Sequence, residues 1–408
     1  MANRIMLNQT SYHGAGAIQE LPAEVKSRGL KKALICCGPT LLRHGVIARV
    51  TDVLDAAGLS YEIFSDIKPN PTIANVTDGV AAFKAAGADY LIAIGGGSPM
   101  DTSKAIGIII NNPEFADVRS LEGVADTKKP CVPIIAIPTT AGTAAEVTIN
   151  YVITDVEKKR KFVCVDPHDM PIVAIVDPDL AETMPKKLVA HTGMDAMTHA
   201  IEAYVSTLHC DYTDPLAIFA IRMIQGDLVD SYNGDMSKRD SMHNAQCLAG
   251  MAFSNALLGI VHSMAHKTGA AFADYGAHII HGAANAMYLP KVIAFNAKDE
   301  TAKKRYGVIA DYMHLGGNND DEKVQLLIKY LRNMNDELNI PHCIKHYGPD
   351  SFPTENGFVP ENVFLERLPE IAKNAIADAC TGSNPRQPSQ EEMEKLLKCC
   401  YYDTEVDF

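Results

Sequence analysis

The chain has 408 residues, more than one hydrophobic core usually serves, so we expect two domains. Hydrophobic residues make up 47% of it and charged residues 21%, which is typical of an ordinary globular protein and excludes a disordered or collagen-like chain. The formal net charge of -13 excludes the usual nucleic-acid-binding protein, because phosphate binding needs a concentrated basic face.

The sequence shows no sign of export or membrane insertion. It has no long apolar core of a signal peptide near residue 1, and no run of about 18 apolar residues that would span a bilayer. We therefore expect a cytoplasmic protein with no membrane partner. The ten cysteines include no CxxC pair, so we expect buried free thiols instead of disulfides.

Short apolar runs alternate with helical stretches between about residue 30 and residue 180. Four of these runs have the pattern of buried parallel strands: Ala33–Cys36, Tyr90–Ile94, Val132–Ile137 and Ile172–Val176. Residues 73–86 carry apolar side chains at helical spacing, and Gly87 is placed to end that helix. Residues 1–184 are therefore predicted to form an α/β domain.

The pattern changes after Pro185. Long periodic segments rich in Ala, Met, Leu and Glu replace the short strands up to the end of the chain. Such segments predict helices, and a proline at this point fits the start of the first one. Residues 185–408 are therefore predicted to form an all-helical domain.

Two turns in the first domain are candidates for binding phosphate. Residues 90–101 run from a strand through Gly95, Gly96 and Gly97 into a helix opened by Ser98 and Pro99. Glycines let backbone amides approach an anion, and the helix N-terminus adds free N–H groups. A tight turn without a ligand is the alternative. Because residues 138–143 form a second such turn, with threonine hydroxyls, the pair suits a dinucleotide crevice.

The second domain contains several potential metal ligands. Asp195 and His199 lie four residues apart, as do His262 and His266, so each pair shares one face of a helix. His281 is a further donor. Imidazoles with one carboxylate suit Fe²⁺ or Zn²⁺, with a position left open for substrate. Hydrogen-bonded core histidines are the alternative, and the spacing alone does not decide between the two.

Taken together, the motifs resemble the iron-containing alcohol dehydrogenase family. The likeness runs over nearly the whole chain, through residues 1–4, 69–72, 95–99, 139–148, 161–163, 193–196 and 380–382. It implies a dehydroquinate-synthase-like fold, with an α/β dinucleotide-binding domain (1–184) and an all-α metal-binding domain (185–408). It also implies hydride transfer between NAD(P)H and a small aldehyde or alcohol. Lactaldehyde and propane-1,2-diol are favoured, with ethanol, butanol and 1,3-propanediol as alternatives and a non-hydride enzyme on the same scaffold as a distant one.

The resemblance also implies roles for single residues. The metal ligands would be Asp195, His199, His262 and His281, and His266 would be a nearby histidine that relays protons. The dinucleotide groove would be lined by Gly38, Asn70, Gly96, Gly97, Ser98, Thr139, Thr140, Thr143 and Lys161. The substrate side would be formed by Asn150, Phe253 and Cys380. The family's dimers imply a homodimer joined in part through residues 5–7.

Four of these roles have plainer alternatives or depart from the family pattern. Lys161 ends a charged run that otherwise indicates a solvated turn, and Cys380 is equally consistent with a packing thiol. NAD-preferring relatives carry an Asp after the first predicted strand, where this chain has Gly38. Loss of that carboxylate favours NADP(H) or dual use. The segment 272–280 is longer than in close relatives and adds His278 as an alternative ligand. The His-Gly-x-x-Asn context nevertheless favours His281.

Overall fold

The computed structural model describes residues 2–158, 160–272, 275, 278–348, 353–355 and 357–408. The chain divides into two compact units, Met6–Met184 and Pro185–Phe408, and the second also includes Met1–Ile5. The sequence-based division had assigned those first residues to the α/β domain. Residues 2–5 precede the first strand and take no part in its sheet, so sheet pairing does not hold them there.

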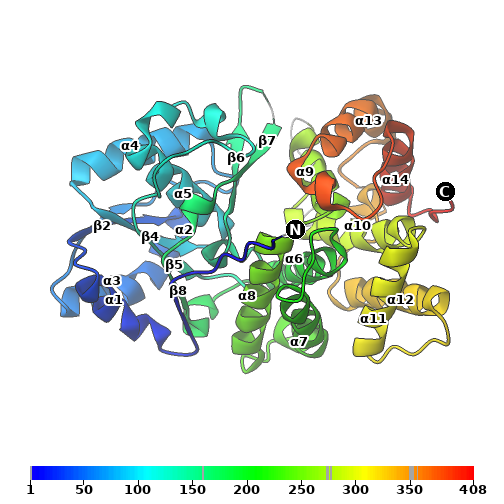
Figure 1. Ribbon diagram of the computed structural model, residues 1–408, viewed down its shortest axis with the longest axis horizontal. Helices are drawn as coiled ribbons and strands as arrows, with labels where there is room; N and C mark the ends of the chain where they lie inside the picture. Colours follow the sequence, from blue (N-terminus) through cyan, green and yellow to red (C-terminus); the bar gives the residue numbers. More distant parts are fainter. Residues whose placement is uncertain (1, 159, 273–274, 276–277, 349–352, 356) are drawn as a thin grey trace. The chain divides into compact units, whose positions relative to one another are not determined.

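A six-stranded sheet forms the centre of the unit Met6–Met184 (Figure 1). Its strand order is β1-β8-β5-β4-β2-β3, and every pairing is parallel. The four predicted strands are confirmed as β2 (Lys32–Cys37), β4 (Tyr90–Gly95), β5 (Ile134–Pro138) and β8 (Val173–Val176). Two edge strands were not predicted, β1 (Thr10–His13) and β3 (Ser60–Phe64).

Helices cover both faces of this sheet. Successive residues of the central strands point to opposite faces, and the residues on both faces are apolar. On one face, residues such as Leu34 and Leu91 pack with α4 (Ile73–Ala86) and α5 (Gly97–Asn111). On the other face, Ile35 and Ile92 pack with α1 (Leu21–Ser27) and α3 (Val46–Ala56). The predicted helix at residues 73–86 is confirmed, and Gly87 ends it in the left-handed conformation with φ 60°.

The same unit contains a two-stranded antiparallel hairpin that is separate from the six-stranded sheet. It consists of β6 (Asn150–Asp155) and β7 (Arg160–Val165). Glu157 and Lys158 of the charged run lie in the exposed turn of this hairpin, whereas Arg160 and Lys161 belong to β7. Lys161 is thus a strand residue, whereas the run by itself indicates a solvated turn.

The second unit is helical, as predicted. Its α-helices are α6 (Lys186–Val205), α7 (Asp214–Tyr232), α8 (Lys238–Ala256), α9 (Ile260–Ala271), α10 (His281–Asn296), α11 (Glu300–Tyr312), α12 (Asp320–Glu337), α13 (Glu361–Ile376) and α14 (Gln390–Tyr402). Beyond Val176 the described part of the chain contains no strand, apart from one isolated bridge between Tyr347 and Pro353.

Helix α6 is buried over most of its length, and two glycines set its distance from neighbouring helices. A Cβ atom on Gly193 would lie 2.1 Å from a methyl carbon of Leu228 on α7. A Cβ atom on Gly282 of α10 would lie 2.0 Å from the backbone oxygen of His191 on α6. Because interiors are close-packed, these contacts leave no room for a larger residue. Both α7 and α10 therefore pack against the helix that carries Asp195 and His199.

No single helix in the described ranges has both the length and the apolar composition needed to cross a membrane. The pair Lys238–Ala256 and Ile260–Gly269 meets those criteria only jointly, and it is bent by 102° at its break. All ten cysteines are buried and free, as expected.

Candidate active site

Four potential metal ligands converge in the helical unit. Asp195 and His199 lie one turn apart on α6, His262 lies in the first turns of α9, and His281 is the first residue of α10. The Oδ1 atom of Asp195 is 3.8 Å from Nε2 of His199, 3.5 Å from Nε2 of His262 and 3.6 Å from Nε2 of His281. One carboxylate oxygen is thus surrounded by three imidazole nitrogens.

These separations fit a bound cation better than direct hydrogen bonds. They exceed the usual N–H···O distance. Metal–ligand bonds of about 2.1 Å at tetrahedral angles place neighbouring donor atoms about 3.4 Å apart, close to the observed values. The ligand atoms of Asp195, His262 and His281 also lie within 4.8 Å of one another. These three residues fit Fe²⁺ or Zn²⁺, and His199, which is not in this group of three, adds a further imidazole through its 3.8 Å distance to Asp195.

The charges at this site favour binding of a cation. Burial opposes ionisation of Asp195, but the three imidazoles outweigh it and hold the pKa of its carboxyl well below the usual range. Burial also disfavours a charged His262, yet the carboxylates of Asp195 and Glu202 outweigh this effect and raise the pKa of His262 to about 9. Two buried carboxylates therefore stabilise positive charge at this position.

The ring of His199 is held between two other rings. It stacks on Phe253 of α8, with centroids 4.2 Å apart and an interplanar angle of 21°. It also stacks on His262, with centroids 4.5 Å apart and an angle of 16°. Phe253, predicted to lie on the substrate side, is therefore in contact with a candidate ligand.

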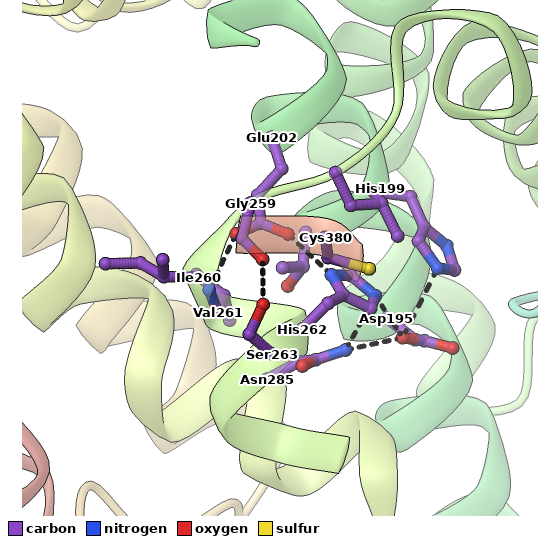
Figure 2. A network of polar contacts seen from close by, with 12 residues as sticks. Asp195, His199, Glu202, Gly259, Ile260, Val261, His262, Ser263, Asn285 and Cys380 are labelled. Carbon is purple, nitrogen blue, oxygen red and sulfur yellow. Dashed lines mark hydrogen bonds and ion pairs between the residues drawn. The ribbon is translucent and has the colours of Figure 1, made fainter. Parts of the chain in front are cut away.

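Two further buried polar residues lie at this site: Glu202, which the sequence reasoning missed, and Asn285, which it used only as part of the motif that favours His281. Glu202 follows Asp195 by seven residues on α6, and Figure 2 shows it beside the ring of His262. Asn285 follows His281 by four residues, and its Nδ2 donates to Oδ1 of Asp195 at 2.7 Å. Helical spacing is the signal for both, because residues four or seven apart from a ligand share its face.

His266 belongs to a second polar cluster. Its Nδ1 lies 3.2 Å from Oδ2 of Asp378, whose Oδ1 accepts from the backbone N–H of Cys380 at 3.1 Å. These three residues offer donor atoms within 4.8 Å of one another. The ammonium of Lys267, however, lies 2.8 Å from the same Asp378 oxygen and already compensates its charge. We therefore interpret the cluster as one that holds His266, whose ring stacks on His281 with centroids 5.3 Å apart.

Burial has different consequences within this cluster. It lowers the pKa of His266, although Asp378 opposes the effect, so the ring is neutral at physiological pH. It raises the pKa of the Cys380 thiol well above the usual range. A neutral imidazole suits a proton relay, whereas a protonated thiol is a packing group and no nucleophile.

The geometry favours His281 over His278. His278 is exposed, and its backbone oxygen accepts from the hydroxyl of Tyr347 at 3.1 Å. His281, in contrast, turns its Nε2 toward Asp195. Of the longer segment 272–280, residues 273–274 and 276–277 lie outside the described residues.

The two predicted phosphate-binding turns lie side by side at the carboxyl ends of β4 and β5. The backbone N–H of Thr139 donates to the oxygen of Gly95 at 2.9 Å. A Cβ atom on Gly96 would lie 3.1 Å from Oγ1 of Thr140, and one on Gly97 would lie 3.4 Å from Cγ2 of Thr143. Glycine at these positions thus lets the second turn approach the first.

The same turns carry polar groups suited to an anion. Gly96 is the N-cap of α5, and no side chain in the described ranges caps that helix end, so the first amides of the helix are available together with Ser98. The Oγ1 of Thr140 is buried and has no hydrogen-bond partner among the residues that the structure describes. An orphaned hydroxyl beside a helix N-terminus fits the pyrophosphate of a dinucleotide.

The remaining predicted groove residues belong to the same unit. The ammonium of Lys161 donates to Oδ1 of Asn70 at 2.7 Å, and burial lowers the pKa of Lys161 to about 8. Asn150 begins β6, and its backbone oxygen accepts from the buried Lys104 at 2.9 Å. Gly38 is half-buried at the start of α2 (Pro39–Arg43), next to the carboxyl end of β2.

Comparison with known families accounts for both units. Residues 8–178 match the model for iron-containing alcohol dehydrogenase, and residues 189–401 match the model for the C-terminal part of the Fe-containing alcohol dehydrogenase family. The chain belongs to the iron-containing alcohol dehydrogenase family. It is therefore an enzyme, an oxidoreductase of the alcohol dehydrogenase and aldehyde reductase type, as the sequence resemblance had implied.

Relatives agree over almost the full length. The chain is 50% identical over 398 residues to the lactaldehyde reductase of Escherichia coli K12, covering 97% of this chain and 99% of that protein. It is 46% identical over 407 residues to the NADPH-dependent butanol dehydrogenase of Clostridium saccharobutylicum, covering 99% and 100%. The crystal structure of a 1,3-propanediol oxidoreductase matches with a TM-score of 0.89 at 33% identity, covering 98% and 100%. The expected fold is thereby confirmed.

Proposed function

We propose that this enzyme holds one Fe²⁺ or Zn²⁺ on Asp195, His199, His262 and His281 and reduces a small aldehyde with a nicotinamide cofactor. The observation that carries this proposal is the convergence of three imidazole Nε2 atoms on Oδ1 of Asp195. Lactaldehyde, with propane-1,2-diol as product, is the favoured substrate, since the E. coli relative is a lactaldehyde reductase. Butanol and 1,3-propanediol, which appear in the names of other relatives, are the alternatives, together with ethanol.

The unit Met6–Met184 would hold the dinucleotide. Its pyrophosphate would bind Gly96, Gly97 and Ser98, whose helix end is not capped by a side chain. Thr139, Thr140, Thr143, Asn70 and Lys161 would line the rest of the groove. Gly38 supports NADP(H) or dual use, because no carboxylate stands there to repel a 2′-phosphate. A cytoplasmic homodimer joined in part through residues 5–7 stays a prediction.

The side chains at this site would have different roles in the reaction. When bound, the cation supplies Lewis acidity to the substrate oxygen and the nicotinamide supplies or accepts the hydride. Asp195 and the three imidazoles would hold the cation, and the substrate oxygen would add to these four ligands, since such an ion can expand from four to five ligands. His266, kept neutral by burial and oriented by Asp378, takes up or releases the proton. Phe253 covers the ring of His199 and excludes water from that side.

An aldehyde panel would test this function directly. Enzyme prepared without oxygen is loaded with Fe²⁺ or with Zn²⁺, and each form is assayed with NADH and with NADPH. We expect activity on lactaldehyde that depends on the metal and is lost in His281→Ala. His278→Ala is the matched control, because this neighbouring histidine is exposed and we expect it to keep both metal and activity. Full activity in a verified metal-free sample would refute the proposal.

A further inference from the structure

Glu202 is a buried carboxylate beside the metal site that is not one of the proposed ligands. Glu202 lies on α6, three residues after His199 and seven after Asp195, so it shares their helix face. Its side chain is 4% exposed. A buried carboxylate is costly unless it is paired and hydrogen-bonded, so its partners indicate what it does.

Each oxygen of this carboxylate has its own partner on α9. Oε2 lies 2.6 Å from Nδ1 of His262, and Oε1 accepts from the backbone N–H of Val261 at 2.8 Å. Figure 2 shows both contacts, with Asp195 at the other nitrogen of the His262 ring. Val261 lies at the start of α9, where backbone N–H groups have no partner within the helix. A carboxylate at this helix end is also favoured by the helix dipole.

The turn before α9 is shaped around the same carboxylate. A Cβ atom on Gly259 would lie 2.8 Å from Oε1 of Glu202 and 2.7 Å from Oδ1 of Asn384. Only glycine therefore lets the chain pass this close to the two side chains. The approach keeps Glu202 within reach of the amide and the imidazole at once.

We propose that Glu202 is a positioning residue for the metal site. By accepting from Nδ1 of His262, it keeps the ring proton on that nitrogen and leaves the lone pair of Nε2 facing Asp195 and the cation. This inference rests on the proposed function, because it assigns Glu202 to the metal site proposed there.

Only a carboxylate satisfies both partners. Glutamine at this position has one acceptor and one donor end. If its oxygen faces His262, its NH₂ group opposes the N–H of Val261. If its oxygen faces Val261, its NH₂ group donates to Nδ1 and moves the ring proton to Nε2, where it blocks the metal. Glu202→Gln therefore keeps nearly the same size but loses one of the two hydrogen bonds in either orientation of its amide.

The experiment measures Zn²⁺ affinity by chelator competition on the full chain, after removal of metal. We expect Glu202→Gln to bind Zn²⁺ about 10- to 100-fold more weakly than the wild type. Glu392→Gln is the matched control. Glu392 also accepts a backbone N–H at a helix start, from Ser389 at 2.9 Å, but its other partner is Arg386 and not a proposed metal ligand. We expect its Zn²⁺ affinity to equal that of the wild type.

A double-mutant cycle separates positioning from general loss of structure. If Glu202 acts through His262, Glu202→Gln should weaken Zn²⁺ binding no further in a His262→Asn background. In a His199→Asn background the loss should persist, because the hydrogen bond to His262 is still present. Equal losses in all three backgrounds, or none in the wild-type background, would overturn the inference alone. A wild-type chain that binds no Zn²⁺ would overturn the proposed function, and this inference with it.

Discussion

Gly38→Asp should change which nicotinamide cofactor the enzyme prefers. Gly38 has an extended backbone, with φ −88° and ψ 153°, which any residue adopts. A Cβ atom there would meet only the backbone oxygen of Ile67 at 3.5 Å, an ordinary van der Waals contact. The substitution therefore introduces a carboxylate at the carboxyl end of β2 without strain. The family resemblance implies an aspartate at this place in relatives that prefer NAD.

The size of the effect follows from two terms. Two unit charges about 4 Å apart repel by about 1 kcal/mol in bulk water and by about 4 kcal/mol at an effective dielectric of about 20. Because Gly38 is half-buried, we take about 2 kcal/mol for repulsion of a 2′-phosphate. A hydrogen bond from the ribose hydroxyl to the new carboxylate adds about 1.5 kcal/mol in favour of NADH. The sum of about 3.5 kcal/mol corresponds to a change of about 300-fold in the ratio of the two cofactors.

The assay is kcat/KM for NADH and for NADPH with one aldehyde, in the wild type and the variant. Gly38→Asn is the control, because it has nearly the same shape without the charge and should shift the ratio much less. A wild type that already prefers NADH by about a hundredfold would contradict the reasoning, since that ratio measures discrimination directly. A ratio that stays within about threefold in Gly38→Asp would contradict it equally.

Two further predictions concern the helical unit. The raised pKa of His262 stabilises the metal-free protein fully below about pH 6.5, and this contribution is lost as the pH rises through about 9. Zn²⁺ binding displaces the same proton, so the affinity for Zn²⁺ should rise over that pH window while the melting temperature of the metal-free protein falls. A Zn²⁺ affinity and a melting temperature that both rise or both fall with pH would contradict the assignment. Gly282→Ala should destabilise the protein by about 1–3 kcal/mol in denaturant unfolding, because its Cβ would lie 2.0 Å from the backbone oxygen of His191. Gly226→Ala, which meets no atom within 4 Å, should not destabilise it.

The strands that sequence predicted are those buried on both faces. Residues 33–36 and 90–94 are apolar without interruption, because helices cover both sides of the central sheet. The strands that it missed have mixed patterns. β3 is an edge strand with mostly exposed side chains, and β6 alternates between buried and half-buried residues. Such patterns resemble loops or turns in the absence of information about their partners.

The metal site was predictable in its parts but not in its arrangement. Helical spacing placed Asp195 with His199 and His262 with His266, but it did not decide which histidine of the second pair faces the carboxylate. The structure answers this through contacts distant in sequence. His262 pairs with Glu202, 60 residues earlier, and His266 pairs with Asp378, 112 residues later. No local pattern connects such residues, so periodicity cannot reveal them.

The two histidines of α9 differ because of the charges around them. His262 lies between the carboxylates of Asp195 and Glu202, and among the described residues no ammonium pairs with either, so the surroundings favour positive charge on or beside its ring. His266 has one carboxylate, and Lys267 already compensates it. Burial then prevails and lowers the pKa of His266. One turn of helix thus separates a position suited to a divalent cation from a neutral imidazole suited to proton transfer, and the difference comes from one extra carboxylate and one ammonium.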